Sequence, residues 1–149
     1  MYERILVPVD GSETSTRGLL EAIKLAQGHA AKLRLLYVVN LSTVALAESA
    51  YPGDELRKRL RQDGEETLKE AETTVRQKGL ETESTLIETP ADNTGEMIVR
   101  QAKEWPADII VMGTHGRRGI ARMILGSSAE FVLRHTAVPL LLVRRSSPE

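Results

Sequence analysis

The sequence predicts a single α/β domain whose parallel sheet is covered by helices on both faces. Five short apolar segments alternate with amphipathic ones along the 149 residues. Strands that alternate with helices in this way form parallel sheets through right-handed crossovers. The segment "LLYVV" at 35–39 is continuously apolar, which is typical of a strand buried on both faces.

The composition narrows the classes of function. Aromatic residues make up 3% of the chain and the net charge is -1, so a stacking platform for single-stranded nucleic acid or a polycationic surface is not expected. The absence of cysteine excludes a disulfide scaffold, a thiol nucleophile and a cysteine-based zinc site. No apolar run approaches the roughly 20 residues of a membrane span, and the N-terminus does not resemble a signal peptide. We therefore expect a cytoplasmic protein that binds neither membrane nor nucleic acid.

The first strand and helix are predicted at the N-terminus. The run "RILVPV" at 4–9 is apolar and β-branched. Ser12 or Thr14 can then cap a helix whose apolar positions recur at helical spacing as far as Ala26, with Gly28 as its stop.

The central part of the chain continues the alternation. A second strand is expected at Lys32–Asn40, an adaptable segment at Leu41–Gly53, and the longest helix at Asp54–Lys78. The third strand lies within Lys78–Glu88, where alternating polarity predicts an edge position.

The C-terminal part supplies the last two strands. A helix over Asp92–Trp105 has Asn93 and Glu96 at the spacing of a capping box. The strongly apolar strand "ADIIVMG" precedes a helix that begins near Gly126, and "VPLLLVRR" is the last strand. We expect one domain over residues 1–145 and a short tail at 146–149.

A glycine-rich stretch after the fourth strand predicts an anion site. Gly113 and Gly116 follow that strand, and Gly126 and Ser127 open the next helix. Glycines let backbone amides approach a ligand, and a helix N-terminus supplies unpaired N–H groups with a partial positive charge. The three arginines of this stretch are Arg117, Arg118 and Arg122, and from Ile109 onward the chain has six basic residues against two acidic ones. The glycines alone are equally compatible with ordinary loop turns, and neither a Walker A loop nor a Rossmann fingerprint occurs.

Two residues near these loops have alternative interpretations. Asp10 follows the first strand, where it can cap the next helix or contact a ribose hydroxyl or a nucleotide-bound metal. His115 lies inside the glycine-rich loop, but no catalytic partner is evident for it. The three histidines have no metal-ligand spacing, and no Gly-x-Ser-x-Gly motif is present.

These motifs resemble the universal stress protein family. "ILVPVDGS" opens the chain, and Gly113, Gly116, Gly126 and Ser127 match that family's pattern of Gly, two residues, Gly, nine residues, Gly and then Ser or Thr. The resemblance implies the ATP-binding branch of the family and a five-stranded sheet of order 3-2-1-4-5, of the adenine nucleotide alpha hydrolase-like kind. It also implies a nucleotide site formed by Pro8, Val9, Asp10, Val38, Val39, Met112, Gly113, His115, Gly116, Arg117, Gly126, Ser127 and Ser128. ATP, or ADP or AMP, would be the ligand, with Mg²⁺ held through the nucleotide and Asp10.

The resemblance also implies a homodimer that pairs through the last strand, Val138–Arg144, although an internal or covered strand is an open alternative. The leading hypothesis is a nucleotide-binding regulator of the stress response. The alternatives are a slow ATPase or nucleotidyl or phosphoryl transferase that uses Asp10 and Mg²⁺, and a plain interaction module that keeps the glycines only for their turns.

Overall fold

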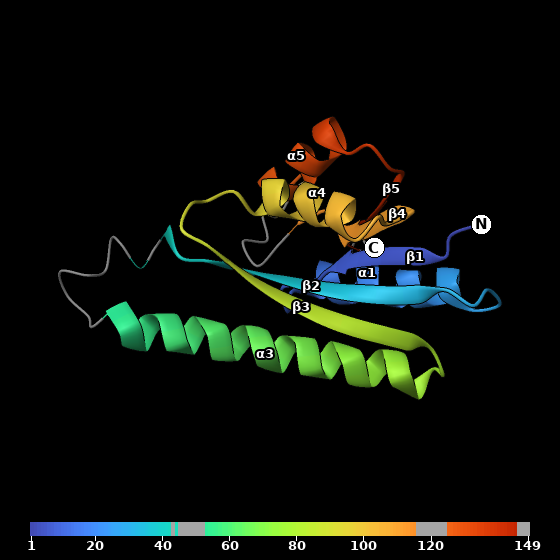
Figure 1. The fold of residues 1–149 in the computed structure, drawn as a ribbon, viewed down its shortest axis with the longest axis horizontal. Coiled ribbons are helices and arrows are strands. Elements are labelled where there is room, and N and C mark those ends of the chain that lie inside the picture. The colour runs from blue at the N-terminus through green and yellow to red at the C-terminus, as the bar shows by residue number, and fades with distance from the viewer. Residues whose placement is uncertain (43, 45–52, 116–124, 146–149) are drawn as a thin grey trace.

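The computed structural model describes residues 1–42, 44, 53–115 and 125–145. Within them, five parallel strands form one sheet in the order β3-β2-β1-β4-β5, which confirms the predicted fold class and strand order (Figure 1). The elements are β1 Arg4–Pro8, α1 Glu13–Ala26, β2 Lys32–Asn40, α3 Gly53–Gln77, β3 Glu81–Thr89, α4 Thr94–Glu104, β4 Ile109–Gly113, α5 Ser127–His135 and β5 Leu140–Val143.

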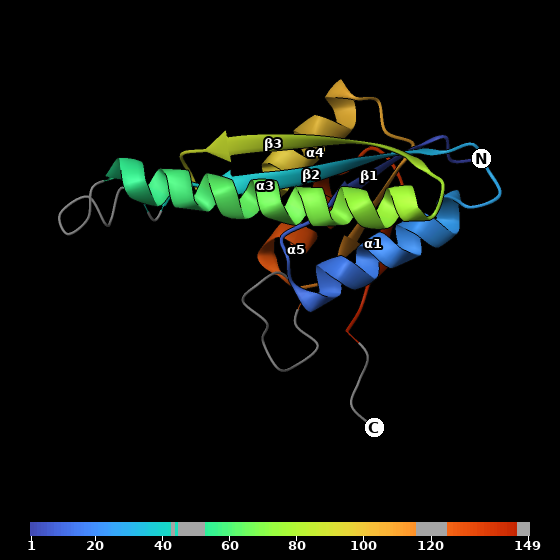
Figure 2. The same cartoon turned by 90° about the horizontal axis from the view of Figure 1, so that it is seen from below.

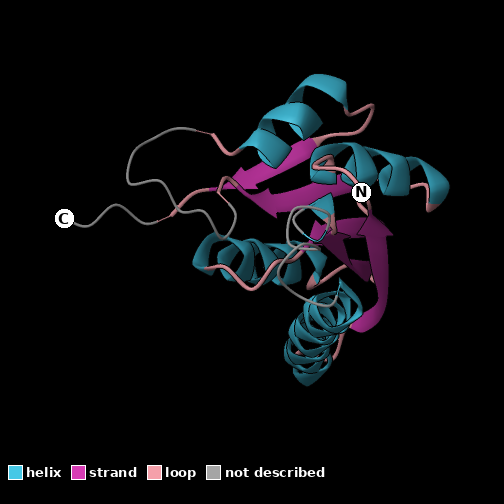
Figure 3. Ribbon diagram, turned by 90° about the vertical axis from the view of Figure 1, so that its left-hand side faces the viewer, coloured by secondary structure: helices cyan, strands magenta, loops and turns pink. Residues whose placement is uncertain are grey.

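Helices cover both faces of the sheet, with α1 and α3 on one side and α4 and α5 on the other (Figures 2 and 3). Successive strand residues point to opposite faces. In β1, Ile5 and Val7 pack under α1 and α3, while Leu6 packs under α4 and α5. Because both faces of the central strands are buried, their apolar runs are continuous in the sequence.

The first helix begins and ends where the sequence predicts. Ser12 is the N-cap of α1, and its hydroxyl accepts a hydrogen bond from the amide of Ser15 at 3.2 Å. After the helix, Gly28 has a φ of +86°, a conformation that glycine adopts without strain.

The capping box predicted for α4 is wrong. Asn93 precedes the helix, but its side chain makes no capping hydrogen bond to the helix backbone. The side-chain oxygen of Asn93, Oδ1, instead accepts a hydrogen bond from the hydroxyl of Thr89. Its side-chain nitrogen, Nδ2, donates to the carboxylate of Glu96 at 3.2 Å. Thr89 is 2% exposed at the end of β3, so the buried hydroxyl takes the acceptor that a cap would otherwise use.

The edge position predicted for the third strand is confirmed, because β3 pairs only with β2 in the described sheet. The long helix α3 begins at Gly53, and residues 43 and 45–52 of the preceding segment lie outside the described residues. Leu68 and Val75 pack α3 onto the sheet. Gly64 lets the helix lie against the ring of Tyr37, since a Cβ there would be 2.7 Å from a ring carbon.

Ion pairs fasten α3 to the exposed edge strand. Glu88 of β3 contacts Arg57 at 2.5 Å and Arg61 at 3.1 Å. The hydrogen bond from Arg57 is the largest influence on Glu88 and lowers the pKa of its carboxyl below 4.5. Burial opposes this shift and Arg61 adds to it. Both arginines are about half exposed, so solvent screening keeps the contribution to stability small.

We expect this cluster to make the fold acid-sensitive. The folded-state pKa of Glu88 lies below the ordinary value of 4.5. Its stabilising contribution is therefore complete at pH values above 4.5. The contribution is lost as the pH falls through the folded-state pKa of Glu88. Urea unfolding at neutral pH and at about pH 3 should show that Glu88→Gln removes part of the acid-induced loss of stability. Glu66→Gln, an exposed change on α3, should leave the loss unchanged, and equal losses in both variants would contradict the assignment.

Candidate functional site

The candidate site lies where the carboxyl ends of β1 and β4 meet. These strands are parallel neighbours, with Ile5 beside Ile109 and Leu6 beside Ile110. From β1 the chain continues to α1 on one face, and the helix that follows β4, α5, lies on the opposite face. The connections therefore diverge at this point, and ligands of open α/β sheets bind at such a position.

The loop after β1 is held by its own hydrogen bonds. The amide of Val9 donates to the carbonyl of Leu36 at 2.8 Å. The Oδ1 atom of Asp10 accepts from the amide of Ser12 at 2.9 Å, and the amide of Asp10 donates to the Ser15 hydroxyl at 3.0 Å. The interpretation of Asp10 as the helix cap is wrong, because Ser12 fills that position. Asp10 instead shapes the turn before the helix, in which Gly11 has a φ of +83°.

Gly113, at the end of β4, has a packing role that the sequence did not reveal. A Cβ at this position would lie 2.7 Å from the carbonyl carbon of Thr14 and 2.8 Å from its Oγ1. On the helix, a Cβ at Gly18 would lie 3.2 Å from the amide nitrogen of Gly113. The backbones of α1 and β4 therefore touch with no side chain between them, and this contact fixes the start of the glycine-rich loop.

Residues 114 and 115 are anchored by three elements. The amide of Thr114 donates to Val143 of β5 at 3.0 Å, and its carbonyl accepts from the amide of Gly126 at 2.7 Å. The hydroxyl of Thr14 donates to the carbonyl of His115. Thr14 is 4% exposed and joins the first turn of α1 to the loop after β4. Sequence reasoning considered Thr14 only as a helix cap, and no motif signalled this bond.

The N-terminus of α5 presents backbone donors. Gly126 is the N-cap and supplies no side-chain capping bond. Ser127 is exposed and Ser128 is half-buried in the first turn. Unpaired amides in a first helical turn favour an anion. The prediction that this helix begins near Gly126 is confirmed.

The predicted adenine-flanking residues do not share one face of the sheet. Val39 is 2% exposed and packs in the core under α1 and α3, whereas Val38 packs against the core under α4 and α5. Met112 lies in the same core as Val38. Of this pair, Val38 therefore has its side chain on the face where Met112 and α5 lie.

Two residues of the predicted site, Gly116 and Arg117, lie outside the described residues, as do Arg118 and Arg122. Across the described ranges, no group of three or more His, Asp or Glu side chains could hold a metal ion. None of the described helices combines the length and the apolarity needed to span a bilayer.

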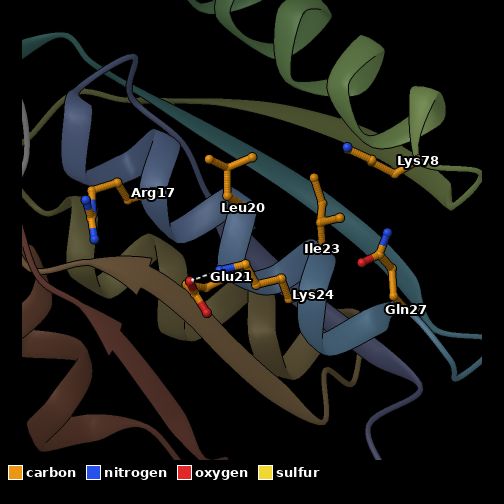
Figure 4. Close-up of a pocket in the computed structure, with 7 residues that line it drawn as sticks. All are labelled: Arg17, Leu20, Glu21, Ile23, Lys24, Gln27 and Lys78. Carbon is orange, nitrogen blue, oxygen red and sulfur yellow. Dashed lines mark hydrogen bonds and ion pairs between the residues drawn. The ribbon is translucent and has the colours of Figure 1, made fainter.

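A surface pocket of about 400 Å³ lies along α1 and extends to Lys78, which follows α3 (Figure 4). Lys24 and Glu21 form an ion pair at 2.8 Å in its wall. The pocket is lined by Arg17, Leu20, Glu21, Ile23, Lys24, Gln27 and Lys78. None of these residues belongs to the predicted nucleotide site, so the pocket and the candidate site are separate.

The topology and the anchored loops define a doubly wound α/β domain with its candidate site at the switch point of the sheet. The chain belongs to the universal stress protein family, whose model matches residues 1–144.

Individual relatives agree with this assignment. The universal stress protein MJ0531 of Methanocaldococcus jannaschii is 31% identical over 150 residues, which cover 100% of this chain and 86% of the relative. The solved structure of MJ0577, from the same organism, is 26% identical, covers 99% of each chain and has a TM-score of 0.86. A universal stress protein solved in complex with cAMP is 25% identical, covers 97% of this chain and 98% of that chain, and has a TM-score of 0.67.

We expect Gly113→Ala to destabilise the fold. The added methyl would meet the backbone of Thr14 at 2.7 Å, and overpacking of this kind costs roughly 1–3 kcal/mol. Chemical denaturation followed by circular dichroism should show a larger loss for Gly113→Ala than for Gly18→Ala. At Gly18 the nearest contact is 3.2 Å, and alanine is favoured by about 1 kcal/mol inside a helix. Equal stability of Gly113→Ala and the wild type would refute the close packing.

Proposed function

We propose that this protein binds ATP at the switch point and acts as a nucleotide-dependent regulator in the stress response. The observation that carries the proposal is the bond from Thr14 to the carbonyl of His115. It joins the first turn of α1 to the loop after β4, beside the N-terminus of α5, where Gly126 is bonded to Thr114. The relative solved with cAMP supports an adenine nucleotide as the ligand class.

The adenosine part of the ligand would lie against the β1 and β2 side of the site. Pro8 provides its apolar wall, and Asp10 contacts the ribose through a carboxylate oxygen. Val9 contributes through its backbone, because its side chain is 6% exposed and lies in the core under α1 and α3. Val38 lies on the face of Met112 and flanks the adenine. Val39 contributes through its backbone, because its side chain is buried in the core on the opposite face.

The phosphates would lie against the β4 and α5 side. Gly113, His115, Gly116 and Arg117 form the loop over ribose and phosphates. Gly126, Ser127 and Ser128 bind phosphate oxygens through amides and hydroxyls at the first turn of α5. These donors serve ATP, ADP or AMP alike. We favour ATP because the sequence of the glycine-rich stretch contains three arginines, whose charge suits the longest phosphate chain.

A magnesium ion would arrive with the nucleotide. Magnesium in nucleotide sites is held by phosphate oxygens, water and one or two carboxylates. Asp10 is the carboxylate of the proposed site, and in the described ranges no larger cluster of metal ligands accompanies it. The chain's own residues therefore fit an ion that is carried by ATP rather than a resident metal.

Regulation fits this site better than efficient catalysis. A ligand that binds only the folded state stabilises it by about 4 kcal/mol at 1,000 times its Kd. Cellular ATP could thus select one conformation or one partner surface. A slow ATPase or phosphoryl transferase is the second candidate, but one carboxylate provides little for metal-assisted transfer. A time course of ATP turnover separates the two, and a rate that falls in Asp10→Ala would favour the enzyme.

We further propose that the protein is a cytoplasmic homodimer that pairs through Val138–Arg144. In the described sheet β5 has one neighbour, β4, and is therefore an edge strand. Leu141 on this strand is 38% exposed. An apolar edge strand with unpaired backbone groups favours pairing with a second copy of itself.

ATP binding should depend on Asp10. We expect Asp10→Ala to weaken ATP binding roughly tenfold or more, because it removes a hydrogen bond made by a charged group. Asp10→Asn keeps the acceptor for Ser12 and should lose less. Isothermal titration calorimetry with Mg²⁺ measures both, with Glu66→Ala on α3 as the surface control. Absence of binding of ATP, ADP and AMP by the wild type at millimolar concentration would refute the proposal.

Self-association should depend on Leu141. We expect Leu141→Lys to shift the protein toward a monomer, because it places a charge on the pairing edge. Leu20→Lys on α1 is a matched control, since Leu20 is 42% exposed and does not belong to the proposed pairing strand. Size-exclusion chromatography with light scattering reads the mass. A monomeric wild type, or equal masses for both variants, would contradict a dimer through β5.

A further inference from the structure

Residues 114 and 115 leave one side-chain atom without a partner. The amide, carbonyl and hydroxyl of Thr114 and the carbonyl and Nδ1 of His115 all take part in hydrogen bonds. The Nε2 atom of His115 is buried and has no hydrogen-bond partner among the described residues. A buried polar atom without a partner costs free energy, so an atom of this kind at the proposed site is best explained by a ligand.

The hydroxyl of Thr114 determines which ring nitrogen carries the proton. Its oxygen lies 2.9 Å from Nδ1 of His115. Thr114 is 6% exposed, so its hydroxyl hydrogen needs an acceptor from the protein. In the described part of the chain, the hydrogen-bond partner of this hydroxyl is Nδ1 of His115. If the hydroxyl donates to Nδ1, that nitrogen carries no proton, and the neutral ring carries its hydrogen on Nε2.

The backbone that carries the two side chains is fixed by its own hydrogen bonds. Thr114 is bonded to Val143 and to Gly126, and the carbonyl of His115 is bonded to Thr14. Gly113, just before them, is in contact with Thr14. The peptide that carries both side chains is thus held from α1, β5 and the start of α5, which keeps the Thr114 hydroxyl and the His115 ring on neighbouring, fixed backbone positions.

We infer that Thr114 is a positioning residue that holds His115 in its Nε2–H form, so that Nε2 donates a hydrogen bond to a phosphate or ribose oxygen of the bound nucleotide. The inference rests on the proposed function and assigns a role to Thr114, which the sequence motifs did not include. His115 is a binding donor here rather than a general base, because its proton-accepting nitrogen is occupied by Thr114.

The tautomer can be measured without nucleotide. Long-range ¹H–¹⁵N spectra of the free protein should show His115 with a protonated Nε2 and an unprotonated Nδ1, assigned by its loss in His115→Gln. His135 is an internal reference of the opposite kind, because its Nδ1 lies 2.9 Å from the carbonyl of Phe131 and must donate to it. Thr114→Val should alter the His115 signals and Thr114→Ser should restore them. A proton on Nδ1 in the wild type would overturn the inference.

Measurements of ATP affinity test whether Nε2 of His115 donates a hydrogen bond to the nucleotide. Thr114→Val and His115→Asn should each weaken ATP binding roughly tenfold, the value of one hydrogen bond to a charged group. Thr114→Ser and His115→Gln, which keep a donor near the same place, should lose less. Thr73→Val on α3 is the surface control. Measurements with adenosine show whether Nε2 donates to a phosphate or to a ribose oxygen. If the variants lose affinity for ATP alone, the acceptor is a phosphate oxygen, and if they lose affinity for both ligands, it is a ribose oxygen.

Two further outcomes count against the inference. Equal affinities for Thr114→Val and Thr114→Ser, with both folded by circular dichroism, would overturn the positioning role. If the wild type binds no adenine nucleotide, the donor role fails together with the proposed function. The tautomer of the free protein then still decides whether Thr114 orients the ring.

Discussion

The contact between the end of β4 and the first turns of α1 is the constraint on which the site depends. Gly113 lies against Thr14, Gly18 lies against Gly113, and the Thr14 hydroxyl bonds the carbonyl of His115. These interactions hold together two loops that are separated by about a hundred residues in the sequence. Without them, the divergence of the connections at the switch point would position neither loop relative to the other.

Most of the fold could be predicted because its signals are local. Continuous apolar runs marked the central strands, alternation marked β3 as an edge strand, and Ser12 marked the start of α1. The capping box at Asn93 failed because the competing partner, Thr89, comes from the preceding strand. A residue pattern shows which groups can bond, but the buried hydroxyl that needs an acceptor is known only from the fold.

The site was predictable in its location but not in the roles of its residues. The glycine spacing identified the loop after β4, yet Gly113 is explained by its packing against Thr14. Asp10 was a candidate cap and is a turn residue. Thr14 was considered only as a cap, and no motif pointed to Thr114. Val38 and Val39 were grouped as neighbours, although alternation along a strand sends them to opposite faces. These roles depend on contacts between distant segments, which no spacing rule encodes.

The glycine contact also limits how this site can be transplanted. Helices usually rest on sheets through interleaved side chains, which can be exchanged for others of similar volume. Here the main chain of α1 contacts the main chain of β4 at Gly18 and Gly113. No side chain lies between them, so the contact cannot be adjusted by exchanging one side chain for another. A graft of the glycine-rich loop onto another scaffold would have to carry the opening turns of α1 with it as one unit.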